Sequence, residues 1–241
     1  LCMSEILAIY RKEMKTYFNS PIAFIVISSF LVITNWLFFD FGDYPFFAIN
    51  IADIRGIFDY GAIVLLFIAP AVSMRLISEE KHQDTLELLV TMPITDMQII
   101  LGKYLSTLVI FAIILGGTLI APISISFVGD LDSGIVISSY IGFFFLGATY
   151  LAMGLAASSF TRNQIVAYIM GIVIIAVFFL MNGMANGSGL IATLFENLSI
   201  RFHYQNFFRG VLDTRDLLYF ISLIFVSLLV SSTALASRKN K

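Results

Sequence analysis

Six long apolar stretches constrain the fold of this chain more than any other feature of its sequence. The hydrocarbon core of a bilayer is about 30 Å thick and takes roughly 20 helical residues to cross, and each stretch is close to that length or longer. A chain of 241 residues that is 59% hydrophobic and 12% charged could not hide so much apolar surface from water as a globule. We therefore predict an all-α integral membrane protein with six transmembrane helices, at residues 22–39, 60–77, 99–128, 135–157, 165–182 and 217–236.

Two of these predicted spans contain residues that interrupt helices. The third is overlong and carries Gly116, Gly117 and Pro122, so we expect it to tilt or break near its outer end. Pro70 lies in the second span, where its missing N–H is expected to produce a kink.

The distribution of basic residues predicts the orientation of the chain. An even number of spans places both termini on one side of the membrane. Of the 14 Lys and Arg residues, four are expected on the opposite side, namely Arg55, Arg201, Arg209 and Arg215. The other ten lie on the side of the termini, which the positive-inside rule assigns to the cytoplasm.

The first 21 residues are predicted to form an amphipathic helix in the cytoplasmic membrane interface. One arc of residues 4–18 is apolar, whereas Arg11, Lys12 and Lys15 lie on another arc, where they can approach anionic lipid headgroups. Two interpretations are open, a simple anchor and a helix that also grips a partner.

On the outer side, residues 183–216 are too apolar to be a loose loop. Leu190, Leu194 and Leu198 recur at helical spacing, and a second such set follows: Tyr204, Phe207, Phe208, Val211 and Leu212. We predict two short amphipathic helices at the outer leaflet, which either cover something between the spans or form an interfacial plug without a function of its own.

The middles of the predicted spans lack ionisable residues, which argues against a proton-coupled or sodium-coupled carrier. Arg75 and Lys103 lie near cytoplasmic ends, where we expect them to extend toward water. The hydroxyl and glycine residues within the spans are better explained by helix packing than by a substrate path.

The sequence also lacks the residues of the common catalytic and metal sites. Cys2 is the single cysteine, and the two histidines, His82 and His203, are expected on opposite sides of the membrane. There is no phosphate-binding loop, so any ATP must be bound by a partner. A net charge of −2 without a basic cluster argues against binding to nucleic acid.

A charged segment, residues 78–98, interrupts the apolar sequence between the second and third spans. Ser78 is predicted to cap a helix that runs to about Thr91, with Glu80, Asp84 and Glu87 in one row. The apolar residues Leu86, Leu89 and Val90 gather on roughly the opposite face.

Pro93 should end that helix, and Thr95 and Gln98 match a capping box that starts the next one. A solvated helix without a partner is the simpler interpretation of such a charge run. However, Leu88 and Met92 stand beside the acidic residues, and this favours a surface for a partner.

Three stretches resemble type 2 ABC exporter permeases. "SEEKHQDTLELLVTMPITDMQIILGKYLS", Ser78 to Ser106, is similar to the segment that contains their coupling helix. "ILAIYRKEMKTYFNSPIAF", Ile6 to Phe24, is similar to their interfacial helix and first span, and "FHYQNFFRGVLDTRDLLYF", Phe202 to Phe220, to the signature before their sixth span. Within that family, the chain most resembles the permeases of gliding motility and of nitrous-oxide reductase maturation.

The resemblance implies a single permease domain over residues 1–241 that exports a substrate across the bacterial inner membrane. It implies a homodimer or a heterodimer of permease subunits, each resting on a separate cytoplasmic ATPase subunit. The ATPase would bind ATP and Mg²⁺, so that this chain would hold no cofactor and would not itself be an enzyme.

Carried over residue by residue, the resemblance assigns two sets of functional residues. The contact with the ATPase would be formed by the coupling-helix residues Glu79, Glu80, Thr85, Glu87, Leu88 and Pro93. The outer signature would fix the outer helices near the exit through Phe207, Arg209, Gly210 and Asp213.

Two other classes of function stay open at this point. A dimer of the same kind could transmit ATP-driven motion to a periplasmic or envelope partner without moving a substrate. An independent channel or carrier would move solute without any ATPase.

Overall fold

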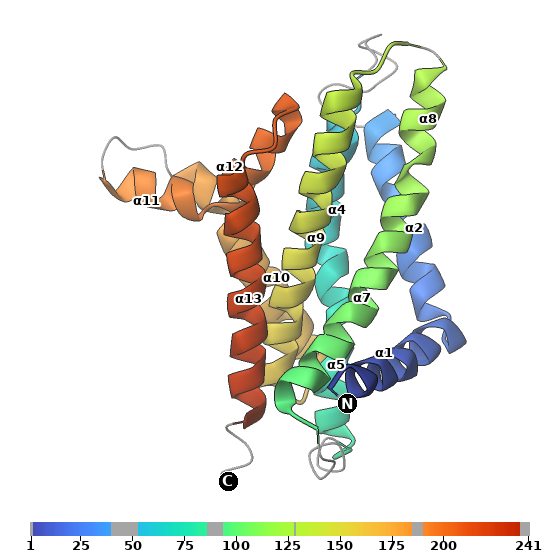
Figure 1. Cartoon of the computed structure of the whole chain (residues 1–241), viewed down its shortest axis with the longest axis vertical. Helices are drawn as coiled ribbons and strands as arrows, with labels where there is room; N and C mark the ends of the chain where they lie inside the picture. The colour runs from blue at the N-terminus through green and yellow to red at the C-terminus, as the bar shows by residue number, and fades with distance from the viewer. Residues whose placement is uncertain (1, 40–52, 86–93, 128, 185–189, 237–241) are drawn as a thin grey trace.

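The structure is a computed structural model that describes residues 2–39, 53–85, 94–127, 129–184 and 190–236. Within those residues all regular structure is helical (Figure 1). The elements are α1 (Cys2–Asn19), α2 (Ile22–Phe39), α4 (Arg55–Ser73), α5 (Arg75–His82), α7 (Asp96–Thr118), α8 (Ile120–Ser126), α9 (Ser133–Phe160), α10 (Gln164–Met184), α11 (Leu190–Leu198), α12 (Ile200–Asn206), the 3-10 helix η1 (Phe207–Arg209) and α13 (Thr214–Ala236).

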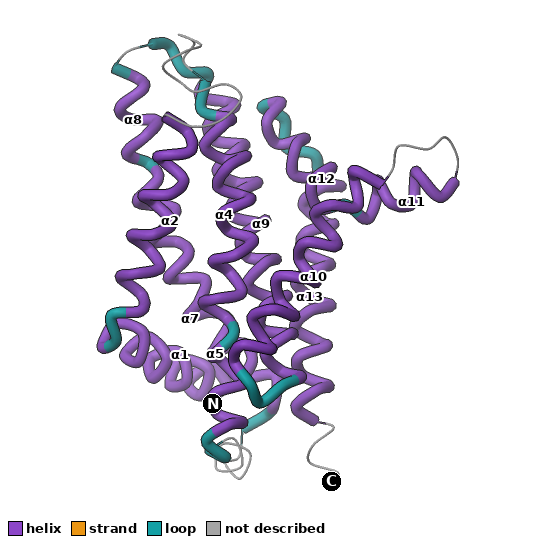
Figure 2. Tube along the Cα trace, turned by 180° about the vertical axis from the view of Figure 1, so that it is seen from behind, coloured by secondary structure: helices purple, strands orange, loops and turns teal. Residues whose placement is uncertain are grey.

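Six helical stretches of the described chain are long and apolar enough to cross a membrane, which confirms the predicted all-α membrane architecture. They are Ile22–Phe39, Arg55–His82, Asp96–Ser126, Ser133–Phe160, Gln164–Gly183 and Thr214–Ala236. Seen from either side, α1 and the last turn of α13 lie at the same end of the bundle (Figures 1 and 2). We call this the terminal end, and the opposite end the outer end.

The second and third spans are each built from two helices. Helix α7 ends at Thr118 and α8 begins at Ile120, so the third span breaks two residues after the Gly116–Gly117 pair, as the sequence predicts. The second span is longer than predicted, because α4 starts at Arg55 and α5 continues to His82. Its interruption falls at Met74, one turn beyond Pro70, which lies inside α4.

Helix α9 is the centre of the bundle and packs against α4, α7, α10 and α13. Its glycines let large side chains of other helices come close to its backbone. A Cβ atom built on Gly142 would lie 2.5 Å from Phe207, and one on Gly147 would lie 2.1 Å from Phe111. The small residues of the span therefore serve helix packing, in line with the interpretation from the sequence.

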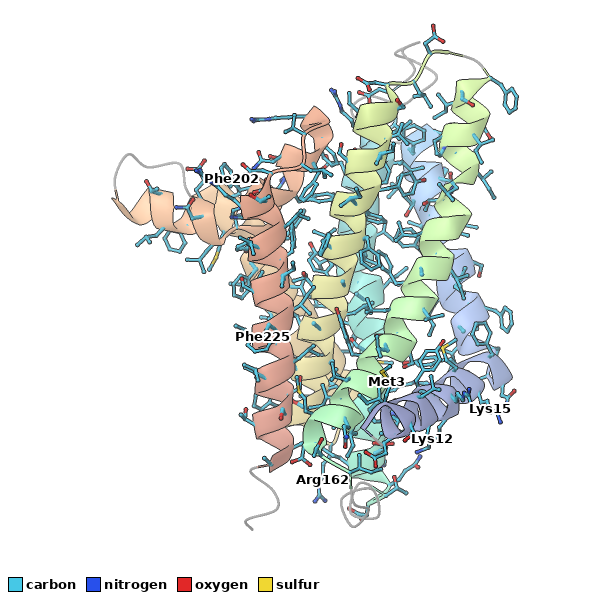
Figure 3. All side chains as sticks on the ribbon, viewed as in Figure 1. Met3, Lys12, Lys15, Arg162, Phe202 and Phe225 are labelled. Carbon is cyan, nitrogen blue, oxygen red and sulfur yellow. The ribbon has the colours of Figure 1, made fainter. Side chains whose placement is uncertain are left out.

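The lateral surface of the bundle, away from its core, carries exposed apolar side chains. Trp36 on α2, Val173 on α10 and Phe225 on α13 are each more than half exposed, and Phe225 points away from the bundle in Figure 3. A soluble protein rarely exposes so many large apolar side chains in contiguous bands, whereas lipid-facing helices do.

The outer segment is only in part as predicted. Helix α11 projects sideways from the bundle and α12 follows it (Figure 1). The second predicted helix, which was to include Val211 and Leu212, is too long: α12 ends at Asn206 and η1 at Arg209. Gly210 then adopts a left-handed conformation with φ of 77°, which stops the helix.

Candidate functional site

Helix α5 carries the first residues of the predicted coupling segment, and it begins earlier than predicted. Ser78 does not cap a helix, because α5 starts at Arg75 and Ser78 lies inside it. Ser78 is fully buried and its hydroxyl donates to the Met74 carbonyl. The predicted cap is wrong because the apolar pair Leu76 and Ile77 packs into the bundle and keeps this part of the chain helical.

The acidic row of the coupling segment is also not formed as predicted. Helix α5 ends at His82, and Asp84 follows it with φ of 53°, so Glu80 and Asp84 do not share a helix. Thr85 bonds back to the end of that helix, its hydroxyl lying 3.4 Å from the Glu80 carbonyl oxygen. The other predicted contact residues, Glu87, Leu88 and Pro93, lie outside the described residues.

Glu80 faces inward, toward a buried amine on α7. The Nζ atom of Lys103 lies 2.9 Å from Oε1 of Glu80 and 2.7 Å from Oε1 of Glu13 on α1. Lys12 adds a second, exposed amine at 3.4 Å from the same Glu80 oxygen. We call these four residues, Glu13, Glu80, Lys12 and Lys103, the charge cluster, and it joins α1, α5 and α7.

Lys103 was predicted to extend toward water, and this is wrong. The residue is only 1% exposed, because α1 lies directly over α7 at this point. The neighbouring Gly102 permits that approach: a Cβ atom there would lie 2.9 Å from Ile9 of α1. The sequence shows the Gly102–Lys103 pair, but the two carboxylates that Lys103 contacts are 23 and 90 residues away along the chain.

A second contact holds α1 against the bundle. The Tyr17 hydroxyl donates to the Val72 carbonyl at 2.9 Å. Burial raises the pKa of the Tyr17 phenol above its usual value, and the Glu13 carboxylate adds to the shift. Tyr17 therefore stays a neutral donor at physiological pH.

Helix α7 begins with the capping box that the sequence predicts. The Gln98 N–H lies 3.4 Å from the Thr95 hydroxyl oxygen, and the Thr95 N–H donates to Oε1 of Gln98 at 2.8 Å. This is the predicted capping box.

The four residues of the outer signature have separate structural tasks. Phe207 is buried, with its ring over Gly142 and its carbonyl accepting from the Ser138 hydroxyl of α9 at 2.7 Å. Gly210 makes the left-handed turn, and Asp213 caps α13 by accepting from the Arg215 N–H at 2.9 Å.

Arg209, like Asp213, is exposed. It borders an open cavity of about 380 Å³ between α4 and the α12–η1 segment. Arg55, Gly56 and Asp59 of α4 line one wall of that cavity, and Gln205 and Phe208 lie with Arg209 on the other.

A histidine contact that sequence reasoning missed joins α12 to α13. Nδ1 of His203 lies 2.6 Å from Oδ1 of Asp216, and Nε2 lies 3.0 Å from the Asn197 carbonyl oxygen. The ring stacks on Tyr219 at 4.0 Å. The thirteen-residue separation of His203 and Asp216 gives no periodic signal, because the turn at Gly210 lies between them.

Tyr204 fastens the same outer segment to α4. Its hydroxyl donates to the Phe58 carbonyl at 3.0 Å, and burial raises the pKa of its phenol well above the usual value.

In the described part of the chain, no group of three or more His, Cys, Asp or Glu residues could hold a metal ion.

Comparison with known proteins agrees with this arrangement. A search of the curated proteins found no match. The family model described as ABC-2 family transporter protein matches residues 7–235, a range that contains the first five spans and all but the last residue of the sixth. The chain therefore belongs to the ABC-2 transporter family and is a multi-pass membrane protein of the permease type, a type that works with a partner ATPase subunit.

Proposed function

We propose that this chain is the permease subunit of an exporter of the bacterial inner membrane, which couples ATP hydrolysis by a separate cytoplasmic ATPase to transport. The observation that carries the proposal is the charge cluster. Three helices that are far apart in sequence are joined at the terminal end by a buried Lys103, beside the segment that resembles a coupling helix.

The charge cluster is suited to transmitting force from α5 to the helices that it contacts. A cation buried between two carboxylates resists separation, because removing either partner leaves an unpaired charge in a medium of low dielectric. A push on α5 would therefore be passed to α1 and α7 together rather than absorbed by one flexible loop.

The proposed contact with the ATPase follows from which residues remain accessible. Glu79, Glu80 and Thr85 are each partly exposed at the terminal end, but the Glu80 carboxylate already pairs with Lys103. We therefore assign the contact to Glu79 and Thr85 and, from the resemblance, to Glu87, Leu88 and Pro93, and give Glu80 the task of holding the helix in place.

The basic residues support the terminal end as the cytoplasmic side. Lys12, Lys15 and Arg162 all lie at this end of the molecule (Figure 3). Lys12 pairs with Glu80 and Arg162 with Asp84, but both basic side chains are more than half exposed, so anionic headgroups or the partner can also approach them. The resemblance further suggests a dimer, and within the family the gliding-motility or nitrous-oxide-reductase-maturation type.

The test of the ATPase contact is co-purification of the tagged chain with an ABC ATPase of the same host. Glu87→Arg should abolish recovery of the ATPase while leaving the amount of inserted permease unchanged. Glu196→Arg makes the same charge change on α11, far from the contact, and should leave recovery intact. Full recovery with Glu87→Arg would contradict the assigned contact.

Export is tested separately, in proteoliposomes that contain the permease and its ATPase. A fluorescent phospholipid and a fluorescent apolar peptide serve as probes, and ATP-dependent movement of either supports export. A bound and active ATPase that moves neither contradicts export and matches the mechanical alternative.

A further inference from the structure

The joint between α4 and α5 interrupts the helix of the second span. Helix α4 ends at Ser73, and the Met74 N–H donates to the Pro70 carbonyl at 2.8 Å. Pro70 has no N–H of its own, so one hydrogen bond of the preceding turn is missing. Helix α5 then begins at Arg75 without a capping side chain from its own sequence.

A new helix start leaves backbone N–H groups without an intrahelical acceptor. At this joint the acceptor comes from another helix. The hydroxyl oxygen of Ser158, near the end of α9, accepts from the Ile77 N–H at 3.1 Å and from the Ser78 N–H at 3.0 Å. The same hydroxyl donates to the Met74 carbonyl at 2.8 Å.

The next residue of α9 holds the other end of α5. The Lys81 amine donates to the Ser159 carbonyl, and both residues are almost fully buried. Two consecutive residues of α9 thus contact the first and last turns of α5, whereas α4 reaches α5 across a single interrupted turn.

We propose that Ser158 is a positioning residue: a helix cap supplied by α9 that makes α5 move with α9 rather than with α4. The transmission role rests on the proposed function, because α5 leads into the segment that would contact the ATPase. A displacement of that segment would then reach α9 directly, in addition to α1 and α7 through the charge cluster, and α9 packs against four of the other spanning helices.

The cap itself is tested by hydrogen exchange of the purified chain in lipid nanodiscs. Ser158→Ala removes the acceptor, so the amides of Ile77 and Ser78 should exchange roughly ten-fold faster, the size expected for a lost hydrogen bond. Ser159→Ala is the matched control, because Ser159 is equally buried and its hydroxyl bonds only to Ala156 of its own helix, at 2.6 Å.

The cap is supported if the amides of Ile77 and Ser78 exchange faster in Ser158→Ala but not in Ser159→Ala. Equal exchange of these amides in the two variants, or rates unchanged from the parent in both, overturns it. If Ser158→Ala does not fold, the pair Ser158→Thr and Ser158→Val decides, since these side chains have nearly the same size and only threonine keeps the hydroxyl. The cap is supported if the Ile77 and Ser78 amides exchange slowly in the threonine variant and quickly in the valine variant. Equal exchange of these amides in the two variants overturns it.

The transmission role is tested by adding the ATPase and ATP to the same nanodiscs. In the unmodified chain and in Ser159→Ala, ATP should change exchange in both α5 and the last turn of α9. In Ser158→Ala the ATPase should still bind and the α5 response should remain, but the α9 response should become clearly smaller, because the Lys81–Ser159 contact is then left to join the two helices. An α9 response as large as in the unmodified chain overturns the role.

These outcomes separate the two proposals. An unmodified chain that binds no ATPase contradicts the proposed function, and with it the transmission role. The exchange of Ile77 and Ser78 without ATPase would still decide whether Ser158 caps α5.

Discussion

The two ends of the bundle are held together by different forces. At the terminal end, charged side chains of α1, α5 and α7 meet in the charge cluster, where Lys103 is 1% exposed. At the outer end, aromatic rings fill the space between helices, as when Phe207 lies over Gly142 of α9. The terminal end therefore depends on complete pairing of charges, and the outer end depends on close fit.

This difference predicts which substitutions are most damaging. Removing one member of a buried ion pair leaves the other charged and unpaired, whereas a packing error can be relieved in part by small shifts of neighbouring atoms. A segment that receives force from outside would benefit from the first arrangement, because the helices cannot separate gradually.

The largest effect is expected from Lys103→Met. It would leave the carboxylates of Glu13 and Glu80 close together without the buried cation, at a cost of about 3–5 kcal/mol in the free energy of unfolding. The measurement is denaturation of the purified protein in mixed micelles. Adding Glu13→Gln and Glu80→Gln to the same chain should recover most of the loss, and a single variant as stable as the parent would contradict a force-bearing cluster.

A smaller loss is expected at the outer end from Gly142→Ala. The added Cβ atom would lie 2.5 Å from Phe207, so the ring must move, at about 1–3 kcal/mol. The matched control is Gly116→Ala on α7, where an added Cβ atom would meet no atom of another described helix within 4 Å and the better helix propensity of alanine should stabilise by up to about 1 kcal/mol. Equal denaturation midpoints for the two variants would show that close fit does not hold the outer end.

The features that sequence reasoning predicted correctly depend on local patterns. The number and order of the spans follow from runs of apolar residues, and the capping box follows from a threonine and a glutamine three residues apart. The break in the third span follows from the adjacent glycines. Each of these signals lies within one element, so no knowledge of the packing is needed.

The features that sequence reasoning missed depend on side chains and backbone groups of other helices. Ser78 has a plausible capping sequence after it, yet burial of Leu76 and Ile77 extends the helix through it. Lys103 is close enough to a span end to reach water, but α1 covers it. Nothing local to α9 marks Ser158, whose partners are about 80 residues away.

The smallest effect is expected from Lys12→Ala, which tests whether burial or mere charge pairing strengthens the terminal end. Lys12 and Lys103 both contact the same oxygen of Glu80, but the Lys12 side chain is 61% exposed and that of Lys103 is 2% exposed. An exposed pair is screened by water and ions, so its loss should cost no more than about 0.5 kcal/mol. The measurement is the denaturation midpoint at low and at high salt, where the small difference from the parent should disappear as salt rises, while the loss in Lys103→Met persists. If Lys12→Ala were as damaging as Lys103→Met, the stability of this end would come from the sum of its charges and not from the one that α1 buries.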